Sequence, residues 1–164
     1  MSTKTLLISE SAAATMRRAA AAAYPDETGG ILLGVRSGNT PWVVRAEEFV
    51  ESTRGRNHFQ IEAGATSAAV QRAQSEDIRL GYLGDWHSHP ADIGPSRMDL
   101  WTLRRYSTVG PGGLATTLIV VRRQNHRWVL DSRRILRCRT VTCLIQLSGD
   151  LLPTRATLPG EIDE

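Results

Sequence analysis

Long apolar runs are missing from this 164-residue chain, and none approaches the roughly 20 residues that a bilayer-spanning helix needs. The first ten residues hold a short apolar patch but no cleavage site of the signal-peptide type. Only two cysteines occur, Cys138 and Cys143, too few for a disulfide framework. These absences predict a soluble, cytoplasmic protein without a membrane partner. The two cysteines are five positions apart, on opposite faces of one predicted strand, which favours two buried free thiols over a disulfide.

Lysine is almost absent, because 19 of the 20 basic residues are arginine and Lys4 is the other one. A GC-rich base composition would explain this bias. Avoidance of side-chain amines would explain it equally well, if the protein works beside enzymes that modify lysine. The formal net charge of +3 is too small to indicate nucleic acid binding without a concentrated basic patch.

The composition predicts one globular domain. Apolar residues make up 41% of the chain, which excludes intrinsic disorder and suffices for a single core at this length. Helices are predicted at residues 9–24, 62–75 and 97–106, and strands at residues 31–35, 42–50, 79–89, 115–121, 127–132 and 138–147, with a polar loop at 51–60. This order favours an α/β domain over residues 1–147, with a curved, mostly antiparallel sheet flanked by helices, and a loosely ordered tail over residues 148–164.

Metal-binding side chains concentrate in residues 84–99, GDWHSHPADIGPSRMD. His87 and His89 are two positions apart at the end of a predicted strand, so both imidazoles lie on the same face, about 7 Å apart at the backbone. Asp99 follows in the first turn of the next helix, where its carboxylate can return as a third ligand. Two nitrogens and one oxygen leave a fourth position for water, which is typical of a catalytic rather than a structural zinc site.

Other interpretations of these residues stay open. Ser96 and Asp99 also form an ordinary helix start, with Ser as the cap and Asp three positions later; this cap is compatible with a metal role for Asp99. Asp85 is a candidate to accept a hydrogen bond from a ligand imidazole, or it is a solvated neighbour. Trp86 alternates to the opposite face of the strand and is expected to pack in the core.

Arginines are frequent near the C-terminal end, with seven in the eighteen residues 122–139. This stretch is either the solvated face of two strands or a patch for an acidic partner or nucleic acid. Aromatic residues suited to base stacking are scarce there, so nucleic acid binding is the weaker interpretation.

Glu27, the HSHP segment at residues 87–90 and the pair Ser96 and Asp99 resemble the signature of the JAB/MPN (JAMM) zinc metalloproteases. In that signature a distant Glu precedes HxHP, a loop and SxxD, and the chain is most similar to the compact bacterial members, which resemble deubiquitinases. The resemblance implies a cytidine deaminase-like fold and one Zn²⁺ per chain, held by the two histidines and Asp99. It further implies that Glu27 is the general base and that Ser96 helps to stabilise the oxyanion.

The same resemblance implies a function: a zinc-dependent isopeptidase or peptidase that removes or processes a ubiquitin-like modifier, in a bacterial conjugation system of the antiphage-defence kind. Its partners would then be a ubiquitin-like protein or its conjugate, and E1- or E2-type enzymes. The alternatives are a non-catalytic MPN scaffold, a RadC-type DNA-associated relative and a phage-tail type hydrolase. One departure from the eukaryotic pattern is visible, since six rather than seven residues separate His89 from Ser96.

Overall fold

A computed structural model describes residues 5–37, 40–50, 53–55, 58–109, 116–136 and 138–150. The strands of its main sheet are β1 (Thr5–Ser9), β2 (Gly29–Ser37), β3 (Thr40–Glu48), β6 (Gly81–His89), β7 (Thr117–Gln124), β8 (Arg127–Leu136), β9 (Arg139–Thr142) and β10 (Leu144–Ser148). The helices are α1 (Glu10–Ala23), α2 (Ala65–Glu76) and α3 (Arg97–Val109), and a small second sheet pairs β4 (Thr53–Gly55) with β5 (His58–Gln60). In the described part of the chain no helix is both long and apolar enough to cross a membrane.

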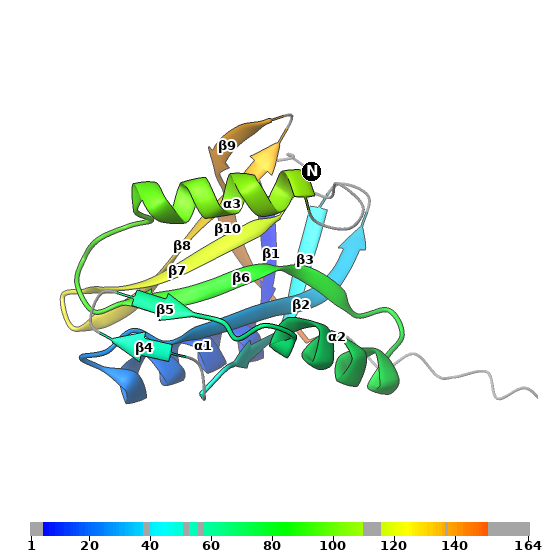
Figure 1. Ribbon diagram of the computed structural model, residues 1–164, viewed down its shortest axis with the longest axis horizontal. Coiled ribbons are helices and arrows are strands. Elements are labelled where there is room, and N and C mark those ends of the chain that lie inside the picture. Colours follow the sequence, from blue (N-terminus) through cyan, green and yellow to red (C-terminus); the bar gives the residue numbers. More distant parts are fainter. Residues whose placement is uncertain are drawn as a thin grey trace, which may run out of the picture.

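The main sheet has eight strands in the order β10-β1-β3-β2-β6-β7-β8-β9 (Figure 1). The pairs β2–β3, β2–β6, β7–β8 and β8–β9 are antiparallel, whereas β1–β10, β1–β3 and β6–β7 are parallel. The predicted α/β domain with a mostly antiparallel sheet is therefore confirmed.

The helices cover both faces of the sheet because the strand residues alternate. Leu32 and Ile119 pack with the alanines of α1 in one core. Their neighbours Ile31 and Leu118 point to the opposite face, where they pack under α2 and α3 respectively. The metal-binding face of β6 is thus the face that carries α2 and α3.

Helix α1 forms as its sequence predicts. The Ser9 side chain caps it by accepting a hydrogen bond from the backbone N–H of Ala12 at 3.2 Å. The small side chains of its buried face, with Met16 among them, let the helix lie close to the sheet. Ala23 is the last helical residue, two positions before Pro25.

Three local predictions were wrong: the loop, the last strand and the burial of Cys138. The expected loop at 51–60 contains β4 and β5, and the N-terminal patch, for which no element was predicted, forms strand β1. The single strand expected at 138–147 is broken at Cys143, because β9 pairs with β8 whereas β10 pairs with β1. Both cysteines are free, but only Cys143 is buried; Cys138 is exposed in the turn before β9. The loose tail stays a prediction, since residues 151–164 lie outside the described part and Ser148 belongs to β10.

Strand β6 is irregular at Gly84, where its register with β2 shifts. Gly84 has φ +151°, and a Cβ built on it would lie 1.8 Å from the backbone oxygen of Thr117. Neither the backbone conformation nor the distance to β7 admits a side chain. This glycine therefore lets β6 lie close to β7, three residues before the first histidine of the candidate site.

Gly84→Ala is expected to lower the free energy of unfolding by about 3 kcal/mol or more, because the methyl group would overlap backbone that cannot move aside. Chemical denaturation measures the loss. Gly81→Ala is the matched control on the same strand, since a Cβ there meets nothing within 4 Å; its effect should stay within about 1 kcal/mol. Equal losses in the two variants would contradict the close approach of β6 to β7.

Candidate metal centre

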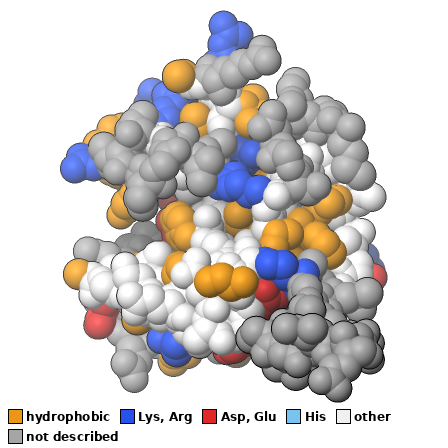
Figure 2. Space-filling model, turned by 90° about the vertical axis from the view of Figure 1, so that its right-hand side faces the viewer, with side chains coloured by type: hydrophobic (Ala, Val, Ile, Leu, Met, Phe, Trp, Pro, Cys, Tyr) orange, Lys and Arg blue, Asp and Glu red, His pale blue; other side chains and the backbone are white. Residues whose placement is uncertain are grey.

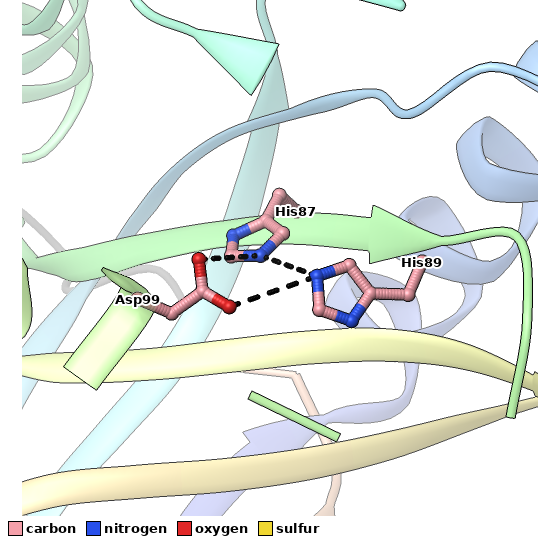
Figure 3. A group of neighbouring side chains, drawn as sticks. All are labelled: His87, His89 and Asp99. Carbon is pink, nitrogen blue, oxygen red and sulfur yellow. Dashed lines mark hydrogen bonds and ion pairs between the residues drawn. The ribbon is translucent and has the colours of Figure 1, made fainter. Parts of the chain in front are cut away.

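Three side chains converge at the end of β6 and the start of α3 (Figure 3). The Nε2 atoms of His87 and His89 are 3.1 Å apart. The two carboxylate oxygens of Asp99 lie 3.4 Å from Nε2 of His87 and 3.7 Å from Nε2 of His89. One ligand atom from each residue lies within 4.8 Å of the others, so the three residues could hold a metal ion.

The donor set fits a small divalent cation such as zinc. Two nitrogens that each lie 2.0–2.1 Å from a tetrahedral zinc ion are about 3.3 Å apart, close to the observed separation of the histidine Nε2 atoms. Two unprotonated imidazole nitrogens facing each other repel unless a cation lies between them. The carboxylate of Asp99 adds the negative charge and the third donor that a catalytic zinc site uses.

His89 is oriented by the loop that follows it. Its Nδ1–H donates to the backbone oxygen of Ile93 at 2.8 Å, which directs Nε2 toward His87 and Asp99. Burial lowers the pKa of His89, and the charge interaction with His87 lowers it further against the opposing effects of the Ile93 carbonyl and Asp99. The neutral imidazole, which is the form that binds metal, is therefore favoured.

The loop itself is fastened to β7. Asp92 forms an ion pair with Arg122 and accepts a hydrogen bond from Gln124 at 3.2 Å. The backbone N–H of Arg123 donates to the carbonyl oxygen of Ala91 at 3.2 Å. These contacts hold the shortened loop beside the histidines, and the sequence analysis missed them because Asp92 and Arg122 are 30 residues apart.

Asp99 serves both the helix and the site. Its carboxylate accepts a hydrogen bond from the backbone N–H of Ser96 at 2.6 Å, while its own N–H donates to Oγ of Ser96 at 3.1 Å. This reciprocal cap starts α3, as one interpretation of the sequence expected, and it aims the carboxylate at the histidines. Burial opposes ionisation of Asp99, but His87 and Ser96 outweigh it and hold its pKa below the usual range.

Glu27 lies two residues before β2, near His87 and Asp99. The position of Glu27 is fixed by hydrogen bonds between the next residue and β6. The backbone N–H of Thr28 donates to Oγ of Ser88 at 3.0 Å, and the N–H of Ser88 donates to the carbonyl oxygen of Thr28 at 2.7 Å. The next residue, Gly29, pairs with His87. Glu27 is only 8% exposed.

The electrostatic surroundings of Glu27 suit proton transfer. Burial raises its pKa to about 7, against the lowering effect of His87 and with a further small rise from Asp99. A carboxyl group with this pKa can both accept and release a proton near neutral pH. Its charge interacts with His87 and Asp99, so Glu27 lies near two of the three metal-binding residues.

Comparison with known proteins agrees with this geometry. Residues 9–134 match the model of a family described as prokaryotic homologs of the JAB domain. The chain belongs to this prokaryotic JAB family. The solution structure of protein DSY2949 from Desulfitobacterium hafniense shares the fold, with a TM-score of 0.71, 23% sequence identity, and coverage of 90% of this chain and 95% of that one. No curated protein matches the sequence.

JAB domains include metalloproteases, and the residues of the signature given in the sequence analysis are present in this one.

Asp85 was expected either to accept a hydrogen bond from a metal-binding imidazole or to be a solvated neighbour, and the structure shows a different partner. Its carboxylate accepts a hydrogen bond from the Tyr82 hydroxyl at 3.0 Å, and it interacts with His87 by charge without a hydrogen bond to that ring. Burial raises its pKa to about 6, although Tyr82 and His87 oppose the rise. Trp86 is fully buried on the opposite face, as predicted, and its indole N–H donates to the backbone oxygen of Glu47.

In the described part of the arginine-rich stretch of the JAB domain, the arginines are not all solvated. Arg122 pairs with Asp92 and Asp131, Arg133 also pairs with Asp131, and Arg134 is only 1% exposed. On the face seen in Figure 2 the basic side chains lie in separate groups among apolar ones. At least these three arginines therefore serve the fold, and Arg122 also fastens the loop that orients His89.

Two connected hollows lie on the metal-binding face of the sheet. The larger, about 860 Å³, lies between α2 and the end of α3, with β2 and β6 beneath it. The smaller, about 70 Å³, extends to Asp99. Asp85, Tyr106 and Thr116 line both hollows, so the larger one leads toward the metal-binding residues.

Proposed function

We propose that this JAB domain is a zinc-dependent peptidase or isopeptidase that cleaves a ubiquitin-like modifier from its conjugate or trims its precursor. The observation that carries the proposal is the convergence of His87, His89 and Asp99 beside a buried Glu27 whose pKa is near 7. A non-catalytic scaffold protein would not need three metal-binding residues beside a carboxyl group that can transfer protons. The hollow beside the site supports an extended polypeptide tail as the bound part of the substrate.

The residues of the chain divide the reaction between them. His87, His89 and Asp99 would hold the zinc ion, which supplies Lewis acidity by polarising a carbonyl group and acidifying water. The Glu27 carboxylate takes a proton from the attacking water while the oxygen of that water bonds to the scissile carbonyl carbon. Glu27 then gives this proton to the amine nitrogen as the C–N bond breaks, which restores the carboxylate.

We propose that Ser96 assists this reaction. Its Oγ accepts the Asp99 N–H, which leaves the hydroxyl hydrogen able to donate to the oxyanion that forms on the carbonyl oxygen. The family resemblance supports the further proposal that the substrate comes from a bacterial ubiquitin-like conjugation system acting in antiphage defence. Its E1- and E2-type enzymes would then be partners, and the protein would act in the cytoplasm.

The direct test is metal-dependent cleavage. We expect the purified protein to hold about one zinc per chain and to cleave ubiquitin-like substrates, tested as a C-terminal fluorogenic amide and as an isopeptide-linked dimer. A chelator should stop cleavage, and added zinc should restore it. Metal analysis and fluorescence measure both effects. Fully zinc-loaded protein that cleaves neither substrate would favour the scaffold role instead.

A further inference from the structure

Thr28, the residue that follows the proposed base, is buried although it belongs to no strand. Helix α1 ends at Ala23 and β2 begins at Gly29, so Glu27 and Thr28 lie in the connection between these two elements. Connecting segments ordinarily run over the surface of a protein. Thr28 is nevertheless fully buried, which indicates that neighbouring strands hold this part of the chain in place.

The backbone of Thr28 is held by β6. Its N–H donates to Oγ of Ser88 and its carbonyl oxygen accepts the N–H of Ser88. Ser88 is itself buried, and it lies between the two metal-binding histidines in the sequence. Both backbone groups of the residue after Glu27 are therefore paired with the strand that carries the metal-binding histidines.

The side chain of Thr28 is held by β3, on the other side of β2. Its Oγ1 donates to Oε1 of Glu48, the last residue of β3, at 2.6 Å. Hydrogen bonds to ionised carboxylates are about twice as strong as those between neutral groups. Because β2 lies between β3 and β6 (Figure 1), contacts from both neighbouring strands meet at Thr28.

These contacts act from the face of β6 opposite to the metal-binding side chains. His87 and Ser88 are consecutive residues of the strand, so their side chains point to opposite faces. The charge of Glu27 interacts with His87, whereas Thr28 contacts Ser88. Thr28 therefore holds the chain from behind, and the carboxyl group of Glu27 stays on the side of the metal-binding residues.

We propose that Thr28 and Glu48 are positioning residues for the proposed base. Their hydrogen bond fixes the backbone next to Glu27 and thereby directs its carboxyl group toward the metal-binding residues, while neither residue contacts metal or substrate. A misplacement of about 1 Å can lower the rate of a reaction about a hundredfold, so a hydrogen bond outside the site can control the rate. This inference rests on the proposed peptidase function.

Two substitutions of Thr28 test the hydrogen bond directly. Thr28→Val replaces the hydroxyl group by a methyl group of similar size, whereas Thr28→Ser keeps the hydroxyl group. With the zinc-loaded protein and the fluorogenic amide, we expect kcat to fall by about tenfold to a hundredfold in Thr28→Val and to stay near the original value in Thr28→Ser. KM and zinc content should stay unchanged in both. Folded Thr28→Val with the original kcat would overturn the inference, whatever its stability.

Glu48→Met removes the acceptor of the same hydrogen bond, and it decides the question if Thr28→Val does not fold. We expect the same loss of kcat at unchanged KM and zinc content. The double variant should be no slower than either single variant, because one hydrogen bond can be lost only once. Additive losses, or an original kcat in Glu48→Met, would overturn the inference. Glu47→Met is the control, since that neighbouring carboxylate pairs with Arg72 of α2 and its loss should leave kcat unchanged.

Amide hydrogen exchange tests the same contact without a substrate. The N–H of Ser88 should exchange about tenfold faster in Thr28→Val, because its acceptor is held less firmly. The N–H of Arg123 on the neighbouring strand β7, which donates to the carbonyl oxygen of Ala91, should keep its rate. If the unaltered protein cleaves nothing, the peptidase proposal fails, and faster exchange at Ser88 would still support the fixing of this segment by Thr28. Unchanged exchange at Ser88 would overturn the inference with or without activity.

Discussion

Replacement of His87 by alanine is expected to remove both the bound metal and the hydrolytic activity. The imidazole supplies one of three donor groups, and it contributes to the low pKa of Asp99, a second donor. Its loss leaves two ligands, one of them a carboxylate with less support for its charge. Metal analysis should find the site largely empty, and kcat/KM should fall by roughly a thousandfold or more, since the Lewis acid is gone.

His126→Ala is the matched control for this substitution. His126 is exposed in the turn between β7 and β8, and its ring contacts Arg123. Its loss should leave zinc content and rate unchanged. A His87→Ala protein that still held one zinc per chain and cleaved at the original rate would disprove the assignment of the metal site, whatever its effect on stability.

The local part of the site could be predicted from the sequence. The spacing of His87 and His89 on one strand requires only the alternation of side chains, and the cap that joins Ser96 to Asp99 requires only four consecutive residues. Helix α1 is similar, because Ser9 and the alanines that follow determine it locally. In each case the interactions that fix the geometry lie within a few positions in the sequence.

The non-local part could not be predicted in this way. Glu27 lies near His87 because Thr28, the residue before β2, exchanges hydrogen bonds with Ser88 of β6, 60 residues further along the chain. The sequence suggested Glu27 through a family resemblance and not through its spacing. The break at Cys143 has the same origin, since β9 and β10 pair with strands at opposite edges of the sheet.

These long-range contacts also explain why the site is held firmly in place. β6 lies between β2 and β7, so His87 is paired with a strand on each side, whereas His89 is paired with β7. The loop that follows is fastened to β7 through Asp92, and it in turn orients His89. The ligands therefore depend on the centre of the sheet, and this dependence makes the backbone at Gly84 important to the site as well as to the fold.

Glu27→Gln is expected to separate chemistry from metal binding. The amide preserves the size of the side chain but cannot accept the proton of the attacking water. We expect kcat to fall by about a hundredfold to ten-thousandfold while zinc content stays at that of the unaltered protein. Glu10→Gln, at an exposed position in the first turn of α1, is the control and should change neither quantity. Normal cleavage by Glu27→Gln would show that another group is the base.

The pH dependence of stability gives a second readout for Glu27 that needs no substrate. In the metal-free protein its pKa is raised from 4.5 to about 7, so the folded state binds more protons than the unfolded state between these values. Stability must then fall as the pH rises through this window. Glu27→Gln removes the titrating group, so it should unfold at higher denaturant concentration than the original protein above pH 7 and at a similar concentration near pH 4. A constant difference between the two proteins at every pH would mean that burial does not raise the pKa of Glu27. The raised pKa would then no longer support its assignment as the base at neutral pH.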